Sequence, residues 1–370
     1  MRIGIDARLY SQTGVGRYIR NLISQLAFID KKNEYFIYFL SEDYDKFLLP
    51  NNRWHKKILN VKWHTIKEQI YVPFYLLRDN LDLVHFPYFN VPILYPKKYL
   101  LTIHDLIIDH FDTGSASTLP AILYKIKRLG YRITTNIGIR KASYISVISE
   151  TTKKEVVDHY SINPSLLAIT YDAIDTNFFN LHKSIKPINF YKFKYILYVG
   201  NAYPHKNLER FILAFKQVRR KHNVSLVLAG DDWYFYPRLK QIVKNLGLDK
   251  SVIFFGNADD KQLINLYSFA RCLVFPSLME GFGLPNLEAI LCGCYPIISN
   301  ISVFHEIWGD DLIYLDPYNI NDIQNKIIDV LNLPMDEYKK RVVLARKRIN
   351  KFSWRQTAID TLKLYQKILI

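Results

Sequence analysis

The chain has 370 residues, of which 49% are hydrophobic and 15% aromatic. That length exceeds one typical core and suits two domains, and the apolar content argues against a disordered chain. Lysine and arginine number 50 against 34 acidic residues, and the net charge of +16 favours an anionic partner: nucleic acid, an anionic membrane face or a phosphorylated substrate. No apolar run approaches the roughly 18 residues that span a bilayer, and three cysteines are too few for a disulfide framework, so we expect a cytoplasmic protein.

Strand-like apolar runs alternate with longer helix-like segments in the first half of the chain. The segments that we predict as strands are 2–6, 34–40, 82–86, 99–105 and 143–149. Such alternation is typical of parallel βαβ units in a doubly wound sheet. The stretch 180–194 lacks periodicity and is predicted to be a linker.

The same alternation restarts after the linker. Its predicted strands are 195–200, 225–230, 251–256, 272–277 and 295–299. The predicted fold class is therefore α/β, with two Rossmann-like doubly wound domains that face each other across a cleft. The expected bounds are 1–180 for the first domain, 181–194 for the linker, 195–350 for the second domain and 351–370 for a last helix that packs back toward the first domain.

Four polar or glycine-bearing loops follow predicted strands. They are TGVG (13–16), HDL (104–106), NAYPHKN (201–207) and MEGFGLP (279–285). In open α/β sheets, ligands bind outside the carboxyl ends of the strands. The sequence therefore predicts that the active site lies at these four loops.

The segment 277–299 places Glu280 and Glu288 around a Gly-Phe-Gly loop. Pro285 suits a first helical position, and no Ser, Thr or Asp precedes it to cap the helix. The amides of such a helix start, together with the helix dipole, favour an anion. The alternative is that Glu288 only complements the dipole and that Glu280 is a solvated loop charge.

Gly14 and Gly16 resemble the start of a dinucleotide fingerprint, but Ile19 stands where the third glycine would be. The acidic run 41–45 falls roughly where a ribose-binding carboxylate would lie, so a nicotinamide-dependent dehydrogenase stays an alternative. Asp43-Tyr44-Asp45 is also an Asp-x-Asp, the pattern that can hold a divalent ion. We predict a solvated turn there and no metal site.

Two further pairs lie at strand ends. His104 and Asp105 follow an apolar strand, where either side chain can contact sugar hydroxyls or shuttle a proton; a buried structural histidine is the alternative. His205 and Lys206 lie at the first binding edge of the second domain, where Lys206 suits a phosphate.

Residues 113–149 contain no acidic residue. One helical face of this stretch is apolar, namely Ile122, Ile126, Leu129, Ile133 and Ile137. Lys125, Arg128 and Arg132 lie on another face. An inward-packing stripe with a solvated basic face would explain the pattern, whereas the missing acids favour an anionic surface as partner.

Six segments in this order resemble one family. They are 4–22, 102–106, 146–156, 168–179, 198–215 and the glutamate segment, in which seven residues that include GFGLP separate the two glutamates. The chain resembles a retaining glycosyltransferase of the GT-B fold, from family 4, which includes bacterial mannosyl-, glucosyl- and rhamnosyltransferases of surface-polysaccharide assembly. The resemblance covers nearly the whole chain.

The resemblance implies a role for each candidate residue. Glu280 would contact hydroxyls of the donor sugar, Glu288 would hold the ribose, and Lys206 would neutralise the diphosphate. The amides of Gly281, Phe282, Gly283 and Leu284 would face the sugar and the diphosphate. Gly14 and Gly16 would form the opposite loop, and His104, followed by Asp105, would lie near the reacting sugar.

The chain departs from the family pattern at two places. His205 stands where many members carry Arg, so only a protonated imidazole would replace that charge. Asp172-Ala173 stands where Asn-Gly is usual.

The implied reaction is front-face transfer with retention, without an obligatory metal or cofactor. The first expectation for the donor is GDP-mannose, and UDP- or dTDP-sugars are alternatives. The expected acceptor is a saccharide or a lipid-linked saccharide, such as one on polyprenyl diphosphate. We expect the protein at the cytoplasmic membrane face, attached peripherally through Lys125, Lys127, Arg128 and Arg132. A basic nucleic-acid-binding protein would explain the charge but not the six ordered segments, so no nucleic-acid partner is expected.

Overall fold

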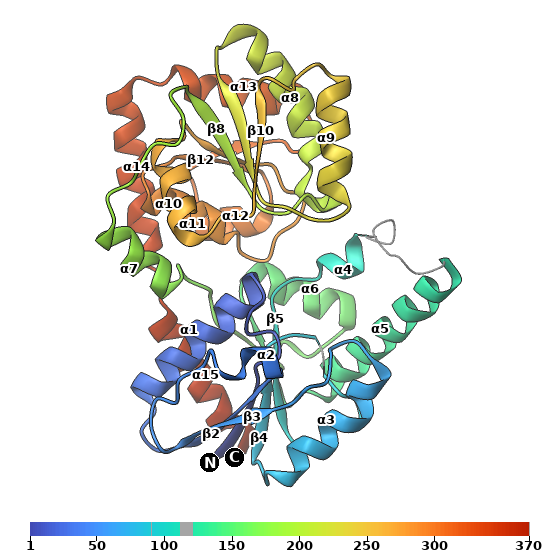
Figure 1. Ribbon diagram of the computed structural model, residues 1–370. Coiled ribbons are helices and arrows are strands. Elements are labelled where there is room, and N and C mark those ends of the chain that lie inside the picture. Colours follow the sequence, from blue (N-terminus) through green and yellow to red (C-terminus); the bar gives the residue numbers. More distant parts are fainter. Residues whose placement is uncertain (90, 112–120, 370) are drawn as a thin grey trace. The chain divides into compact units, whose positions relative to one another are not determined.

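The computed structural model describes residues 1–89, 91–111 and 121–369 (Figure 1). The chain divides into two compact units. The first comprises Met1–Leu106, Ser117–Asp172 and Ser353–Ile370, and the second comprises Ile107–Ala116 and Ala173–Phe352.

A seven-stranded parallel sheet forms the centre of the first unit, in the order β3-β2-β1-β4-β5-β6-β7. Its strands are β1 (Arg2–Asp6), β2 (Glu34–Phe39), β3 (Trp54–Ile58), β4 (Leu83–Phe86), β5 (Tyr99–Ile103), β6 (Tyr144–Val147) and β7 (Leu167–Ile169). The order 3-2-1-4-5-6 is that of the Rossmann fold, in which the strand order reverses between the first and the fourth strand.

Helices cover both faces of this sheet. On one face, α1 (Gly14–Ile29) packs against the C-terminal helix α15 (Trp354–Leu369), and His85 of β4 contacts Tyr365 of α15 through a 2.8 Å hydrogen bond. On the other face lie α3 (Ile66–Arg78), α5 (Ala121–Lys141) and α6 (Glu150–Tyr160), as right-handed crossovers require (Figure 1). The short helices α2 (Ser41–Tyr44) and η2 (Pro164–Leu166) lie in the loops.

The second unit repeats the pattern with six parallel strands in the order β10-β9-β8-β11-β12-β13. The strands are β8 (Tyr195–Val199), β9 (Ser225–Ala229), β10 (Val252–Gly256), β11 (Leu273–Phe275), β12 (Pro296–Ser299) and β13 (Ile313–Leu315). The helices are α4 (Ile107–His110), α7 (Thr176–Ser184), η3 (Pro204–Lys206), α8 (Leu208–Lys221), α9 (Phe235–Asn245), α10 (Asp260–Phe269), α11 (Leu284–Leu291), α12 (Ser302–Trp308), α13 (Ile320–Asn332) and α14 (Met335–Ile349). The strand order reverses between β8 and β11, which is where such a sheet binds its ligand.

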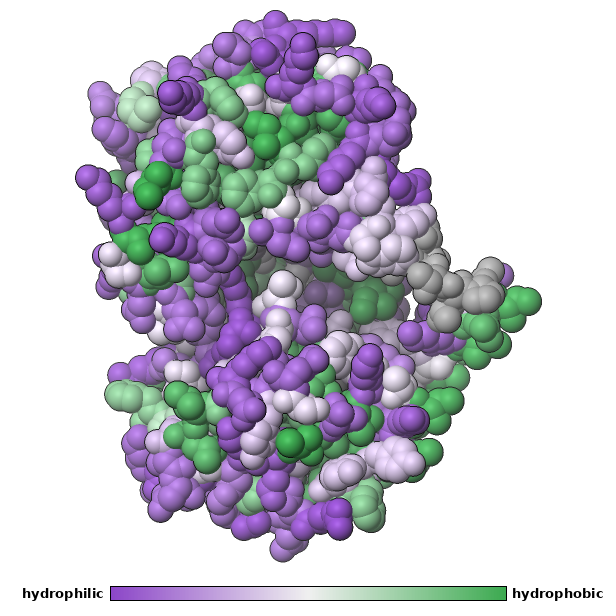
Figure 2. All heavy atoms as spheres, viewed as in Figure 1, coloured by the Kyte–Doolittle hydropathy of each residue, from purple (hydrophilic) through white to green (hydrophobic). Residues whose placement is uncertain are grey.

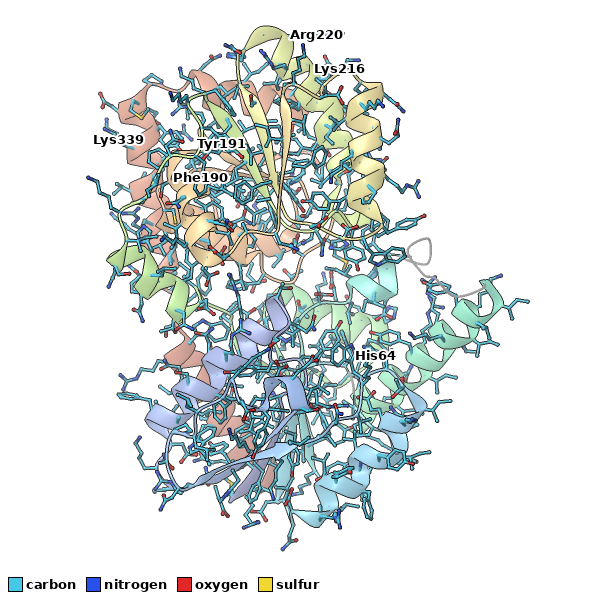
Figure 3. All side chains as sticks on the ribbon, viewed as in Figure 1. His64, Phe190, Tyr191, Lys216, Arg220 and Lys339 are labelled. Carbon is cyan, nitrogen blue, oxygen red and sulfur yellow. The ribbon has the colours of Figure 1, made fainter. Side chains whose placement is uncertain are left out.

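The predicted linker, 181–194, precedes β8. Its first residues, up to Ser184, are the end of helix α7, and the remainder packs on the second unit. The amide of Ile188 donates to Asn265 of α10 over 2.8 Å, and the ring of Phe190 stacks on Phe255 with centroids 5.8 Å apart (Figure 3). Tyr191 contacts Tyr195 of β8 edge-on. This segment is therefore anchored along its length by side chains.

None of the helices in the described part of the chain is long and apolar enough to cross a membrane.

Candidate functional site

Lys206 ends a short helical turn at the carboxyl end of β8. The next residue, Asn207, has φ +61° and begins the turn into α8. Its side-chain amide donates to the carbonyl oxygens of Pro276 (3.1 Å) and Pro317 (2.7 Å). These hydrogen bonds fasten the β8 loop to the loops that follow β11 and β13.

Glu280 lies in that second loop, and the structure brings it to Lys206. The amide of Leu278 donates to the carbonyl of His205 over 2.7 Å, and Lys206 Nζ lies 2.6 Å from Glu280 Oε1. The two side chains are only 14% and 9% exposed. A charge-assisted pair thus lies where β8 and β11 end side by side, at the point where the strand order reverses.

Gly283 closes the loop and precedes α11. Its φ is +86°, and a Cβ there would lie 2.7 Å from the Phe304 ring and 2.9 Å from Asn286 Nδ2, so no other residue fits without strain. No side chain caps the start of α11, as the sequence predicted. The positive end of this eight-residue helix therefore lies in the same loop as Glu280.

Sequence reasoning missed two polar side chains near this helix start. Asn286 is fully buried, and neither atom of its amide has a hydrogen-bond partner among the described residues; the same holds for the hydroxyl of Ser277. Such groups cost free energy unless a partner arrives. The signal in the sequence was an asparagine in the run LPNLEAIL, in which Glu288 is the only other polar residue.

Helix α11 begins at Leu284, so Pro285 lies within its first two positions, next to the expected first one, and no acidic residue lies in the first turn. Glu288 lies one turn further in and is only 2% exposed. Its carboxylate accepts a 3.2 Å hydrogen bond from the Tyr267 hydroxyl of α10. The helix dipole acts mainly within the first turn, so this position weakens the interpretation of Glu288 as a dipole partner.

His205 is buried and uncharged at neutral pH. Burial, reinforced by the Lys206 charge, lowers the pKa of its imidazole from 6.5 to about 3. The ring lies near those of Tyr203 and Phe111, at centroid distances of 6.2 and 5.7 Å. In this structure His205 does not supply the positive charge that an arginine would carry there. Lys206 therefore supplies the positive charge where the loops after β8 and β11 meet.

His104 lies in the first unit, directly after β5. Its Nε2–H donates to the Pro87 carbonyl over 2.9 Å, and its ring meets Tyr18 of α1 edge-on at 4.9 Å. Burial lowers the pKa of this imidazole to about 4. A neutral ring protonated at Nε2 keeps a lone pair on Nδ1, which can accept a hydrogen bond from a hydroxyl.

Asp105 is half-buried and lies near Glu155 of α6. The pKa of Glu155 rises to about 7, mainly because the carboxyl is buried and further because of the Asp105 charge. The carboxyl group of Glu155 therefore binds and releases a proton near neutral pH.

The glycines after β1 lie within helix α1, which begins at Gly14, and not in a loop before it. A Cβ on Gly16 would lie 2.5 Å from the Tyr10 carbonyl oxygen, whereas one on Gly14 would meet nothing within 4 Å. Packing therefore explains why position 16 is a glycine. No such steric reason requires a glycine at position 14.

The predicted solvated turn at Asp43-Tyr44-Asp45 is wrong for Asp43. This residue lies in α2 and is buried, and its carboxylate accepts hydrogen bonds from Ser11 and from Lys46 (2.7 Å). Asp45 is exposed. The described residues contain no group of three or more His, Cys, Asp or Glu side chains that could hold a metal ion.

Residues 182–348, within the second unit, match the family described as Glycosyl transferases group 1. The second unit is a group 1 glycosyltransferase domain. This match gives the dehydrogenase alternative no support.

Three curated relatives extend the similarity. The chain is 27% identical to the O-antigen chain mannosyltransferase RfbU of Salmonella typhimurium, over 69% of this chain and 66% of the relative. It is 24% identical to O-antigen chain mannosyltransferase B of Escherichia coli, over 96% and 97%. A Campylobacter jejuni N-acetylgalactosaminyltransferase named for a diphospho-undecaprenol acceptor is 27% identical over 68% and 67%.

Solved structures show the fold of the whole chain. Anabaena HepE in complex with UDP-glucose superposes with a TM-score of 0.75 at 15% identity, over 99% of this chain and 100% of HepE. WaaG, a glycosyltransferase involved in lipopolysaccharide biosynthesis, superposes with a TM-score of 0.71 at 15% identity, over 98% and 99%. The group 1 domain is therefore the second of two Rossmann-like units of a GT-B glycosyltransferase fold.

Proposed function

We propose that this protein transfers a hexose from a nucleoside-diphosphate sugar to a saccharide acceptor, with retention of configuration. The observation that carries the proposal is the Lys206–Glu280 pair at the strand reversal of the group 1 domain. A cation and a carboxylate at that edge suit the two halves of such a donor, the diphosphate and the sugar hydroxyls.

Lys206 would stabilise the departing diphosphate. An ammonium has three N–H donors, of which one is directed at Glu280, so two remain for phosphate oxygens. Negative charge grows on the leaving group as the glycosidic bond breaks, so a preorganised cation lowers the barrier most in the transition state. The uncapped start of α11, with the amides of Gly281 to Leu284, would add to this stabilisation.

The carboxylates would orient the donor. Glu280 would accept hydrogen bonds from the sugar hydroxyls, and Glu288, held by Tyr267, would accept from the ribose. The unpartnered amide of Asn286 can complete its hydrogen bonds with the same ligand.

The first unit would serve the acceptor side of the reaction. His104 would accept a hydrogen bond at Nδ1 from a sugar hydroxyl near the reacting carbon, with Asp105 beside it and Gly14 leaving room for the donor. A departing phosphate oxygen would take the proton of the attacking hydroxyl, so front-face transfer needs no further base.

For the donor we propose GDP-mannose first, because two of the curated relatives are named mannosyltransferases. UDP- and dTDP-sugars are the alternatives, and one structural neighbour binds UDP-glucose. For the acceptor we propose a growing or lipid-linked saccharide at the cytoplasmic membrane face, in cell-surface polysaccharide synthesis.

A mass-spectrometric screen of nucleotide sugars tests the proposal. The purified protein should bind and slowly hydrolyse one donor class, and GDP-mannose should exceed UDP- and dTDP-sugars. With an acceptor in hand, NMR of the product should show the donor's anomeric configuration. Inversion would refute the mechanism, and the absence of binding to any nucleotide sugar would refute the function.

A further inference from the structure

Helix α5 has an apolar outer side and an aromatic inner side. Its outer row recurs three or four residues apart and is 49% to 73% exposed: Ile122, Ile126, Leu129 and Ile133. Figure 2 shows hydrophobic side chains gathered over the outer end of this helix. The interpretation in which the stripe packs inward is therefore wrong for these four residues, and the anionic surface expected as the partner of this stretch stays a prediction. Tyr131 lies on the opposite side of the helix, where it contacts loops of the first unit.

Four aromatic side chains form a row at the carboxyl edge of the first sheet. His104 follows β5, and the centroid of its ring lies 6.5 Å from that of Tyr88, which follows β4. Tyr88 lies 6.2 Å from His64, and His64 lies 5.5 Å from Tyr131 (Figure 3). The buried ring of Phe89 contacts both tyrosines, at 5.1 and 6.4 Å, and supports them. We call His104, Tyr88, His64 and Tyr131 the ring row; the last three are half-buried, so each keeps part of its side chain at the surface.

His64 has a backbone conformation that residues other than glycine rarely adopt. Its φ is +57°, in the left-handed region. Such conformations cost free energy and persist where the surrounding structure enforces them, most often at binding and active sites. The amide of His64 donates to Glu68 Oε2 over 2.7 Å, and this hydrogen bond holds the strained residue in place.

A buried ion triad fastens the loop that carries His64. Arg8 Nη2 lies 2.6 Å from Asp6 Oδ2 and 2.7 Å from Glu68 Oε1, and the three side chains are at most 2% exposed. Arg8 Nη1 donates to the carbonyl of Val61 over 2.9 Å. Replacing a buried ion group of this kind by apolar side chains is often neutral or stabilising, so stability alone does not explain the triad. Its hydrogen bonds to Val61 and His64 indicate that it positions residues 61–64.

The imidazole of His64 is uncharged at neutral pH. Burial, reinforced by the positive charges of Lys127 and Arg8, lowers its pKa from 6.5 to about 4. A neutral imidazole has one N–H donor and one lone pair, which match a hydroxyl group better than an anion. The faces of aromatic rings carry partial negative charge and attract the C–H groups of a sugar ring. The ring row therefore has the chemistry of a saccharide subsite.

We propose that the ring row binds the acceptor saccharide, with His64, Tyr88 and Tyr131 contacting the sugars beyond the one that receives the hexose. This inference rests on the proposed function, in which His104 lies near the reacting carbon. The row leads away from His104 along the ends of β5, β4 and β3, the edge at which such sheets bind ligands. Arg8 and Glu68 are positioning residues that act through His64.

Transfer to acceptors of different length tests the subsite. The probes are linear trisaccharides of mannose, glucose, galactose and N-acetylglucosamine, and the methyl glycoside of each sugar. The wild type should use at least one trisaccharide with a KM about tenfold or more below that of its methyl glycoside, because each added ring contact contributes severalfold. Equal KM values, or no transfer to any trisaccharide while donor hydrolysis continues, would overturn the subsite and leave the proposed function standing. The absence of donor binding would refute the proposed function instead.

Removal of the rings locates the subsite. Tyr88→Leu/Tyr131→Leu should raise the KM of the preferred trisaccharide about tenfold or more and abolish its advantage over the methyl glycoside. Tyr88→Phe/Tyr131→Phe retains the rings and should keep most of that advantage. The matched control Tyr71→Leu/Tyr75→Leu changes two tyrosines of α3 that are 50% and 40% exposed, and it should behave as the wild type does. A wild-type advantage in Tyr88→Leu/Tyr131→Leu, or equal losses in the two leucine variants, would overturn the proposal.

Substitutions of His64 and Glu68 test the positioning. His64→Asn removes the ring but tolerates the left-handed backbone, so it should raise the trisaccharide KM severalfold. Glu68→Gln keeps an oxygen for the His64 amide and removes the charge that pairs with Arg8, and it should raise the same KM. In both variants the KM of the nucleotide sugar should stay near the wild-type value. A lower unfolding temperature of Glu68→Gln with an unchanged trisaccharide advantage would show that the triad is only structural and would refute its positioning role.

Discussion

The ammonium of Lys206 lies 2.6 Å from the carboxylate of Glu280, although 74 positions separate them in the chain. Each residue follows a strand that borders the reversal in strand order, and backbone and side-chain hydrogen bonds join the two loops. The pair holds Lys206 in place before a donor binds, so the ordering of its flexible side chain is partly complete in advance.

We expect Lys206→Ala to lower turnover by about 100-fold to 1,000-fold, the usual effect of removing one preorganised group that stabilises a leaving anion. The unfolding temperature should change little by comparison. Steady-state kinetics with the true donor measure the first effect and thermal unfolding the second. Lys216→Ala, on the α8 surface, is the matched lysine truncation and should retain full turnover. Wild-type turnover in Lys206→Ala would remove this residue from the site.

Glu288→Ala should weaken nucleotide-sugar binding by about tenfold or more, since one charge-assisted hydrogen bond contributes roughly 1.5–3 kcal/mol. Calorimetric titration measures the affinity, and circular dichroism should show an unchanged fold. Tyr267→Phe keeps the carboxylate and removes one of its donors, so its effect should be smaller. Equal affinity in Glu288→Ala and wild type would leave this residue with a structural role alone.

His205→Asn should leave the proton uptake on nucleotide binding unchanged from about pH 6 to about pH 8, because the pKa of the buried imidazole, about 3, lies well below that range. Binding enthalpies in two buffers with different ionisation heats give the number of protons exchanged. An uptake in the wild type that the variant lacks would mean that His205 becomes cationic on the bound diphosphate.

Asp172→Asn should raise the free energy of unfolding at about pH 8, and should raise it less at about pH 5. Burial raises the pKa of Asp172 from 3.8 to about 7, and its Oδ1 has no hydrogen-bond partner among the described residues. The native state therefore holds a proton that the unfolded chain releases, so wild-type stability falls as the pH rises from about 4 through about 7. The side-chain amide in Asp172→Asn does not ionise, so the stability of this variant does not fall with pH in this way.

Denaturant unfolding at the two pH values measures the difference, which we expect at about 1–3 kcal/mol in favour of the variant at the higher pH. Equal stability of both proteins at about pH 8 would show that water or a rearrangement satisfies the carboxylate. The resemblance to the family places asparagine at this position, which agrees with the expected direction.

Chelators should leave transfer activity largely intact. Asp43, the buried member of the Asp-x-Asp, is already bonded to Ser11 and Lys46, and Lys206 supplies a cation for the diphosphate. Activity assays with EDTA, and with added magnesium, check this. A complete loss that magnesium restores would assign the charge neutralisation to a metal ion instead.

The strands that the sequence predicted have continuous apolar runs, and all of them except β10 lie inside a sheet. The three that it missed lie at sheet edges: β3, β7 and β13. An edge strand is buried less and is often short or charged, as in WHKKI of β3, so its apolar pattern is weak. Its assignment depends on the neighbouring strand, which lies elsewhere in the chain.

The alternation of strands and helices along the sequence determined the two parallel sheets, because repeated βαβ units can be arranged in few other ways. It also determined the uncapped start of α11, since Gly283 and Pro285 act within a few residues. Only the tertiary structure decided that Lys206 meets Glu280, that His104 and His205 are neutral, and that the apolar row of α5 points outward. The physical reason is common to all three: periodicity and turn chemistry are local, whereas burial and charge pairing depend on what packs against each side chain.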